Sequence, residues 1–208
     1  TGWGLGELHT GGLSQVARVK GEWIVKKPND LSLLECMAIG TAGFTSMLCL
    51  LTLEKHNIFP SSGPILVTGS SGGVGSISIA LLSNMGYEVE ALTRRPEMSS
   101  YLQALGASAV LSLDQLEEPG KILAPERWAG IIDAAGGDIL TRIIPSVKYW
   151  GCIASCGNTA GIKFSSNVLP FILRGISLSG IESAYHPIQQ RKNVWDRLSK
   201  NLPRNLLQ

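Results

Sequence analysis

Short apolar runs alternate with longer stretches of helical periodicity from residue 64 onward. The apolar runs, with their β-branched residues and flanking glycines, predict strands at 65–68, 87–92, 109–111, 128–134, 151–155 and 176–181. The stretches between and after them predict helices at 73–85, 97–105, 139–147, 168–174 and 186–198. Strands that alternate with helices at this spacing form βαβ units around a parallel sheet. The pattern therefore predicts an α/β fold with a doubly wound parallel sheet.

The first 57 residues have a different pattern. Residues 13–19 and 22–25 carry β-branched and aromatic residues between glycines, and we expect strands there. Residues 35–57 are helical in pattern, with Gly40 and Gly43 as interruptions and a second helix at 44–56. Residues 1–35 are too few to close a sheet. They are predicted to be the end of another domain, followed by a helix at 36–57 and a main domain over 36–208.

A glycine-rich loop, Gly69-Ser-Ser-Gly-Gly-Val-Gly75, joins the first strand of this alternation to a helix. Glycines in this context allow a sharp turn, close approach of the backbone to a pyrophosphate, and tight packing of the helix on the sheet. A P-loop needs Lys followed by Ser or Thr after the last glycine, whereas Ser76 and Ile77 follow here. The short-chain dehydrogenase pattern needs a Tyr with a Lys four residues later, and none of the four tyrosines has one. The loop therefore predicts a dinucleotide site.

The end of the second strand favours one nicotinamide cofactor. NAD sites place Asp or Glu at this point for the ribose 2′-hydroxyl, and NADP sites use hydroxyl and guanidinium groups for the 2′-phosphate. The chain has Thr93, Arg94 and Arg95 here, and Glu88 and Glu90 come too early in the strand. A solvated basic loop is the alternative interpretation. We predict a preference for NADPH.

Composition narrows the function classes. The chain has 208 residues, of which 44% are hydrophobic and 16% charged, with a formal net charge of +2. High hydrophobicity with low charge excludes disorder, and the small net charge argues against a nucleic-acid binder that depends on bulk phosphate attraction. No signal peptide or membrane-spanning run is evident, so we expect a cytoplasmic protein. The four cysteines and three histidines show no metal-ligand spacing, and free thiols are expected instead of a metal site.

The chain as a whole resembles the medium-chain dehydrogenase/reductase superfamily, quinone-oxidoreductase-like, and within it the acrylyl-CoA reductase branch. The resemblance extends over residues 1 to about 203. It is carried by Gly2-Trp3-Gly4, Gly11-Gly12-Leu13, Ile39-Gly-Thr-Ala-Gly-Phe-Thr45, the glycine loop, Trp128-Ala129-Gly130, residues 151–161, Pro170-Phe-Ile-Leu-Arg174 and Glu182-Ser183.

The resemblance implies two domains, a GroES-like catalytic barrel and a Rossmann NADP-binding domain. Residues 1–35 would be the C-terminal part of the barrel, with most of it outside this chain. In the Rossmann part the resemblance assigns the pyrophosphate to Ser71, Gly72, Gly73 and Val74, and the 2′-phosphate to Thr93, Arg94 and Arg95. It places Asn158, Ile172 and Ser183 along the nicotinamide half, and Thr41 where the interdomain helix approaches the nicotinamide as a catalytic candidate. Thr41 could instead cap the helix that follows it, Ile172 could be core packing, and Ser183 could serve a turn.

The implied reaction is zinc-independent, NADPH-dependent reduction of an activated carbon–carbon double bond, with acryloyl-CoA as the substrate to which the resemblance points. An NADPH-dependent quinone reductase is the nearest alternative. A non-catalytic NADPH-binding redox sensor or structural module is another. The resemblance further implies a homodimer that pairs the edge strand of the Rossmann sheet at 176–181, an edge that needs covering. Neither nucleic acid nor membrane is expected as a partner.

Overall fold

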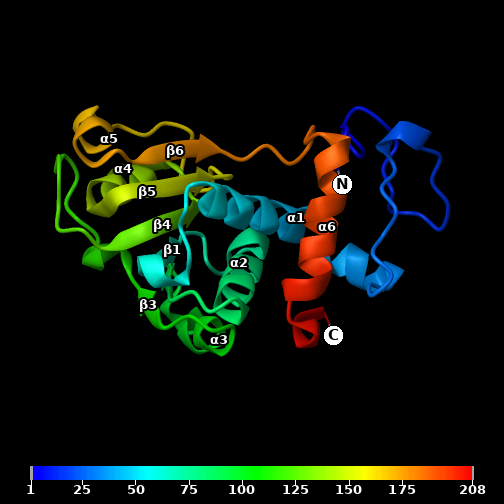
Figure 1. Ribbon diagram of the computed structural model, residues 1–208, viewed down its shortest axis with the longest axis horizontal. Coiled ribbons are helices and arrows are strands. Elements are labelled where there is room, and N and C mark those ends of the chain that lie inside the picture. The colour runs from blue at the N-terminus through cyan, green and yellow to red at the C-terminus, as the bar shows by residue number, and fades with distance from the viewer. Residues whose placement is uncertain (1, 208) are drawn as a thin grey trace.

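The computed structural model describes residues 2–207 and shows one six-stranded parallel sheet in the order β3-β2-β1-β4-β5-β6 (Figure 1). The sheet order reverses between β1 and β4, as in a doubly wound fold built from two mononucleotide-binding halves. The predicted α/β class and its parallel sheet are confirmed. The strands are β1 (Ile65–Val67), β2 (Val89–Leu92), β3 (Ala109–Leu111), β4 (Trp128–Asp133), β5 (Val147–Ser155) and β6 (Ser177–Gly180).

Helices cover both faces of this sheet (Figure 1). Successive residues of β4 show why, since Ile131 joins one buried cluster and Ile132 the other. Side chains of a strand point alternately to its two faces, and both faces are apolar here, as in the buried strands of parallel sheets. The helices are α1 (Leu33–Lys55), α2 (Gly73–Asn84), α3 (Ser99–Ala104), α4 (Gly137–Ile143), α5 (Leu169–Arg174) and α6 (Ile188–Asn201).

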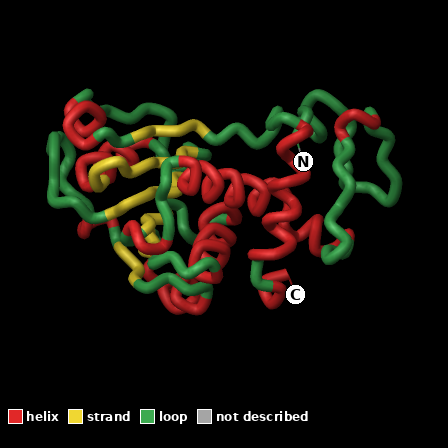
Figure 2. The backbone as a smooth tube through the Cα atoms, viewed as in Figure 1, coloured by secondary structure: helices red, strands yellow, loops and turns green. Residues whose placement is uncertain are grey.

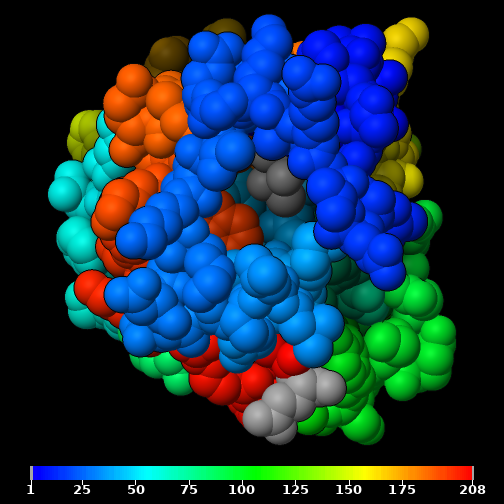
Figure 3. Space-filling view, turned by 90° about the vertical axis from the view of Figure 1, so that its right-hand side faces the viewer, coloured from blue at the N-terminus to red at the C-terminus, as the bar shows by residue number. Residues whose placement is uncertain are grey.

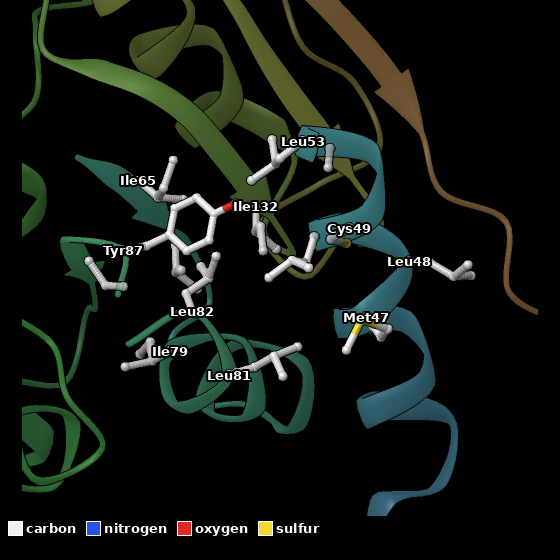
Figure 4. Packing of buried hydrophobic residues seen from close by; sticks show 14 of the residues in the cluster. Met47, Leu48, Cys49, Leu53, Ile65, Ile79, Leu81, Leu82, Tyr87 and Ile132 are labelled. Atoms are coloured by element: carbon white, nitrogen blue, oxygen red, sulfur yellow. The ribbon is translucent and has the colours of Figure 1, made fainter. Parts of the chain in front are cut away.

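The larger cluster lies between the sheet and the helices α1, α2 and α6. Figure 4 shows its centre, where Cys49 and Leu53 of α1 approach Ile132 of the sheet and Leu82 of α2. All four side chains are fully buried. Burying each apolar side chain contributes about 1.5–3 kcal/mol. This packing fixes α1 and α2 against each other and against one face of the sheet.

Helix α1 consists of two helical parts. It begins at Ser32, whose hydroxyl accepts a hydrogen bond from the Glu35 backbone N–H, while the Glu35 carboxylate accepts one from the Ser32 N–H. At Gly40 the backbone leaves the helical region (φ 53°, ψ −153°), a conformation that glycine adopts without a steric penalty. The predicted interruption at Gly40 is confirmed, and Gly43 remains helical. Within residues 2–207, α1 is the one helix apolar and long enough to cross a membrane, and more than half of its most apolar window is buried.

The strands expected at 13–19 and 22–25 are wrong. Residues 2–31 form loops with a short 3₁₀ helix, Gly21–Trp23 (Figure 2). Leu13 is 98% exposed and Val16 87% exposed, so neither has a strand beside it to complete a buried face. A β-branched, glycine-spaced segment forms a stable strand only when a neighbouring strand satisfies its backbone.

Arg191 of α6 fixes the start of this N-terminal segment to the rest of the protein. Its guanidinium lies 5.2 Å from the ring centre of Trp3 and 4.9 Å from that of Phe44. It also donates hydrogen bonds to the carbonyls of Ser183, Ala184 and His186. The remainder of the segment forms an arc around a hollow in which α6 is visible (Figure 3).

Candidate dinucleotide site

The glycine-rich loop connects β1 to the start of α2. Gly69 has φ +60°, and its carbonyl accepts the Gly72 N–H in a tight turn. Gly72 is the residue that precedes α2. A Cβ at Gly75 would lie 2.3 Å from the Gly69 carbonyl oxygen and 2.6 Å from the Ser70 Cα, so only glycine allows α2 to pack this closely on the loop.

The first turn of α2 carries backbone N–H groups that the helix itself does not satisfy. Because the helix dipole adds partial positive charge at the same end, this arrangement favours an anion such as a phosphate. Ser71, Gly72, Gly73 and Val74, the residues predicted for the pyrophosphate, all line the cleft at this position.

The cleft has a volume of about 680 Å³ and lies at the carboxyl ends of β1, β2, β4 and β5. This edge is where an open α/β sheet binds its ligand, next to the reversal in strand order. Its lining comprises residues 69–75 of the glycine loop, 92–95 after β2, Leu113, Ala134, Ala135, Ile139, Cys156, Gly157, Thr159 and Ala160. The cavity is large enough for an extended small ligand.

The tip of β2 forms the basic end of the cleft. The Thr93 hydroxyl accepts a hydrogen bond from the Arg95 backbone N–H (3.1 Å), which bends the chain here. The Arg95 guanidinium donates to the Ser71 hydroxyl and so joins this tip to the glycine loop. Arg94 is exposed beside it. The structure thus brings together the two segments predicted for the pyrophosphate and the 2′-phosphate.

Two buried polar groups that sequence reasoning missed hold the cleft in shape. The Ser70 hydroxyl donates to the carbonyls of Val67 (2.7 Å) and Leu92 (3.0 Å), and so joins the ends of β1 and β2. The Asp133 carboxylate, fully buried at the end of β4, accepts hydrogen bonds from the Thr68 hydroxyl (2.6 Å) and from the backbone N–H groups of Ala135 and Gly136. A buried carboxylate needs such partners.

This carboxylate positions the turn between β4 and α4, which lines the cleft beside the glycine loop, because the N–H groups from which it accepts hydrogen bonds belong to that turn. The Ser155 hydroxyl at the end of β5 donates to it as well (3.3 Å). The signal in the sequence was a polar residue at the end of two apolar strands, Thr68 and Asp133, and parallel strands place such ends side by side.

The other predicted site residues lie at different distances from the cleft, and two of them, Asn158 and Thr41, are exposed. Asn158 lies in the loop after β5, between two residues that line the cleft, and its side chain is exposed. Thr41 is exposed where α1 resumes after Gly40. Its neighbour Ala42 packs against α2, so that a Cβ at Gly73 would lie 3.1 Å from the Ala42 Cβ.

Ser183 and Ile172 lie outside the cleft lining. Ser183 follows β6 at the carboxyl edge, and its carbonyl accepts a hydrogen bond from Arg191 (2.9 Å). Ile172 belongs to α5, which precedes β6 and therefore lies at the amino end of the sheet, the opposite edge. Its side chain is 68% exposed. Their assignment to the nicotinamide half stays a prediction, and α5 does not bring Ile172 to this cleft.

Residues 73–200 match the family model described as zinc-binding dehydrogenase. The chain belongs to this family. Acrylyl-CoA reductase AcuI of Ruegeria pomeroyi is 44% identical over 209 residues, which are 100% of this chain and 63% of the relative. This chain therefore spans less than two thirds of that protein. The predicted resemblance to the medium-chain superfamily and its acrylyl-CoA reductase branch is confirmed.

Two solved structures superimpose closely on the chain. The yhdH oxidoreductase from Salmonella enterica in complex with NADP has a TM-score of 0.96 at 45% identity, and the match covers 100% of this chain and 64% of that one. Bacillus subtilis protein yhfP with NAD bound has a TM-score of 0.96 at 43% identity, with the same coverage.

The family description implies zinc, but the residues present do not form a site for it. Among residues 2–207, no three His, Cys, Asp or Glu side chains are grouped so that they could hold a metal ion. A zinc site needs three or four such ligands.

Proposed function

We propose that the cleft binds NADPH. The observation that carries the proposal is the junction of the N-terminus of α2 with the basic tip of β2, which Arg95 and Ser71 join directly. The N–H groups at the start of α2 would receive the pyrophosphate. The Thr93 hydroxyl and the Arg94 and Arg95 guanidinium groups would receive the 2′-phosphate, since guanidinium groups bind phosphate through paired charge-assisted hydrogen bonds.

We propose further that the whole protein is an oxidoreductase that reduces an activated carbon–carbon double bond, with acryloyl-CoA as substrate and propionyl-CoA as product. The similarity to acrylyl-CoA reductase AcuI supports this reaction. When bound, NADPH supplies a hydride for the β-carbon. The chain's own residues bind and orient the cofactor. The turn after Asp133 and the glycine loop both line the cleft in which it would lie.

A quinone reductase is the second candidate. It is favoured by the putative quinone oxidoreductase YhfP of Bacillus subtilis, which is 43% identical to this chain over 203 residues. The two activities are distinguished by assaying the full-length protein with NADPH on acryloyl-CoA and on a quinone. Turnover of the thioester alone supports the first proposal. Turnover of the quinone alone supports the quinone reductase instead. Tight NADPH binding without turnover of either compound supports a non-catalytic NADPH-binding module.

The remaining sequence predictions are part of the same proposal. Residues 1–35 would complete a GroES-like catalytic domain, with residues 36–57 as the interdomain helix. Thr41 would contact the nicotinamide from that helix. Asn158 would contribute its backbone from the loop after β5. A cytoplasmic location accompanies this function.

We also propose a homodimer through β6. This strand is an edge of the sheet, so one side of its backbone has no partner strand within the described chain. Exposed Ile172 and Leu173 on α5 lie next to the start of β6 and extend the surface that a second copy would cover. Light scattering tests this directly. A dimer mass supports the proposal, and a monomer at micromolar concentration contradicts it.

Titration of the chain with NADPH and with NADH, followed by nicotinamide fluorescence, tests the cofactor proposal. We expect NADPH to bind more tightly than NADH, because only NADPH carries the 2′-phosphate. Replacing Arg94 and Arg95 by Ala should weaken NADPH binding about 10–100-fold, with little effect on NADH. Arg18→Ala, an exposed arginine outside the cleft, serves as the control. Equal affinity for the two cofactors would refute the preference for NADPH.

A further inference from the structure

Cys156 lies where the end of β5 enters the cleft. Its backbone N–H donates to the Asp133 carbonyl (2.8 Å), and its thiol donates to the same oxygen (3.5 Å). The residue is half-buried and contributes to the cleft lining. The two hydrogen bonds to one carbonyl hold the backbone and side chain of Cys156 in a defined position at the floor of the cleft.

Cys49 lies behind Cys156, on α1. It is fully buried in the large cluster, against which Cys156 also packs (Figure 4 shows Cys49). Cys156 packs against the cluster that contains Cys49, and the two thiols are close enough to shift each other's pKa, although 107 positions separate them in the sequence. Two neighbouring cysteines, one on a residue that lines a cleft and one fully buried, form the arrangement of a reactive and a resolving thiol.

The surroundings of the two thiols shift their pKa values in opposite directions. The nearby Cys49 thiol lowers the pKa of Cys156 below its ordinary value, because its hydrogen bonding stabilises the Cys156 thiolate. The same interaction, together with burial, raises the pKa of Cys49 well above its ordinary value. Thiolate character and access to solvent determine which cysteine reacts first.

We propose that Cys156 and Cys49 are an oxidisable dithiol at the floor of the nucleotide cleft, which closes to a disulfide in the presence of hydrogen peroxide. The Cys156 thiolate attacks one peroxide oxygen and the O–O bond breaks. With one proton taken up, the products are the Cys156 sulfenic acid and water. The Cys49 thiol then attacks this sulfur, the S–O bond breaks, and a second water leaves. Both sulfurs are oxidised and the peroxide is reduced.

The other two cysteines lack these features. Cys152 is buried on β5, and burial raises the pKa of its thiol, which donates a hydrogen bond to the Ser179 hydroxyl. Cys36 is half-buried near the start of α1, and burial raises the pKa of its thiol as well. Neither lines the cleft. They are therefore the internal controls for selectivity.

The first test counts thiols without any cofactor, so that its outcome does not depend on the proposed NADPH binding. The chain is treated with hydrogen peroxide, unfolded, alkylated with iodoacetamide and analysed by peptide mass spectrometry. We expect two of the four cysteines to escape alkylation and to appear as one disulfide-linked peptide pair containing Cys49 and Cys156. Dithiothreitol should restore both. If all four thiols are alkylated after the peroxide treatment, or if the disulfide joins a different pair of cysteines, the proposal is overturned.

Single variants test the order of the two steps. In Cys49→Ser the disulfide should be absent and the Cys156 sulfenic acid should be trapped by dimedone. In Cys156→Ser all three remaining thiols should be alkylated. The matched control Cys152→Ser should form the disulfide like the natural chain. Circular dichroism checks folding, and Cys49→Ala replaces the serine variant if the buried hydroxyl unfolds it. Dimedone labelling of Cys36 or Cys152 in place of Cys156 would contradict the assignment.

A second test rests on the proposed function and asks whether NADPH bound in the cleft slows oxidation of the dithiol. If NADPH covers Cys156, a concentration about ten times its Kd should slow disulfide formation about tenfold by mass action. NADH at the same concentration should protect less. Disulfide formation without protection would leave the dithiol in place and would contradict only its coupling to the cofactor.

Discussion

Replacing Gly75 by Ala tests how the first helix of the nucleotide cleft packs on its loop. The added Cβ would lie 2.3 Å from the Gly69 carbonyl oxygen, 2.6 Å from the Ser70 Cα and 2.8 Å from the Gly69 carbonyl carbon. All three are backbone atoms, which cannot rotate away as a side chain can. Ordinary contact begins near 3.4 Å, so the loop or the helix must move by about 1 Å.

The stability change follows from two opposing terms. Overpacking of this kind costs about 3 kcal/mol at the upper end of its range. Alanine gains about 1 kcal/mol over glycine inside a helix. We therefore expect a net loss of about 2 kcal/mol, or about 4–8 °C in Tm for a chain of this size. NADPH binding should weaken as well, because the displaced N–H groups no longer converge on one phosphate position.

Urea unfolding followed by circular dichroism measures the first effect, and fluorescence titration with NADPH measures the second. Gly73→Ala is the matched control for stability, because its Cβ would meet only the Ala42 Cβ at 3.1 Å, a contact that a small shift relieves. If Gly75→Ala were as stable as the natural chain and bound NADPH equally well, the argument from close packing would be refuted.

Three further predictions concern the groups that hold the fold together. Replacing Arg191 by Met removes its cation–π contacts with Trp3 and Phe44 and its hydrogen bonds to the carbonyls of Ser183, Ala184 and His186, which should lower the free energy of unfolding by about 2–4 kcal/mol in thermal unfolding. A loss below about 0.5 kcal/mol would contradict this. Asp133→Asn should cost about 2 kcal/mol in urea and weaken NADPH binding, because one acceptor oxygen becomes an amide that repels the N–H groups it faces; unchanged affinity would show that the turn is held by other means. Burial raises the pKa of Tyr87 from its ordinary value of 10.0 to about 12, so the folded state keeps the phenol neutral. The stabilising contribution of the neutral phenol is fully present below pH 10 and should be lost as the pH rises toward 12, because the unfolded chain releases this proton first. Tyr87→Phe should reduce this alkaline loss, and identical pH profiles of the two proteins would rule the effect out.

The elements of the main domain could be predicted from the sequence because their signals are local. Apolar runs bounded by glycine identified six strands, and β3 was predicted with its observed bounds. The glycine loop and the basic segment after β2 could be predicted for the same reason. Each is a contiguous set of residues, and the backbone of the first and the charge of the second are both suited to binding phosphate. The break in α1 at Gly40 was visible for the same reason.

Features that depend on distant residues could not be predicted in this way. The strands expected at 13–19 and 22–25 failed because a strand requires a partner, and no neighbour is present for Leu13 or Val16. The sequence could not show that α5, which carries Ile172, lies at the amino edge of the sheet, and the assignment of Ile172 to the nicotinamide half stays a prediction. The hydrogen bonds by which the Ser70 hydroxyl joins β1 to β2, and those that the Asp133 carboxylate accepts, form only when β1, β2 and β4 lie side by side.

The sequence by itself determined the fold class, the position of the dinucleotide loop and the basic character of its second segment, because periodicity, glycine placement and charge act over a few neighbouring residues. Only the tertiary structure decided which of these segments meet. It joined Arg95 to Ser71, placed the Asp133 carboxylate where it holds the turn that lines the cleft after β4, and packed Cys156 against the cluster that contains Cys49. Those contacts arise from sheet order and helix packing, which depend on the burial of the whole chain and not on any single stretch of it.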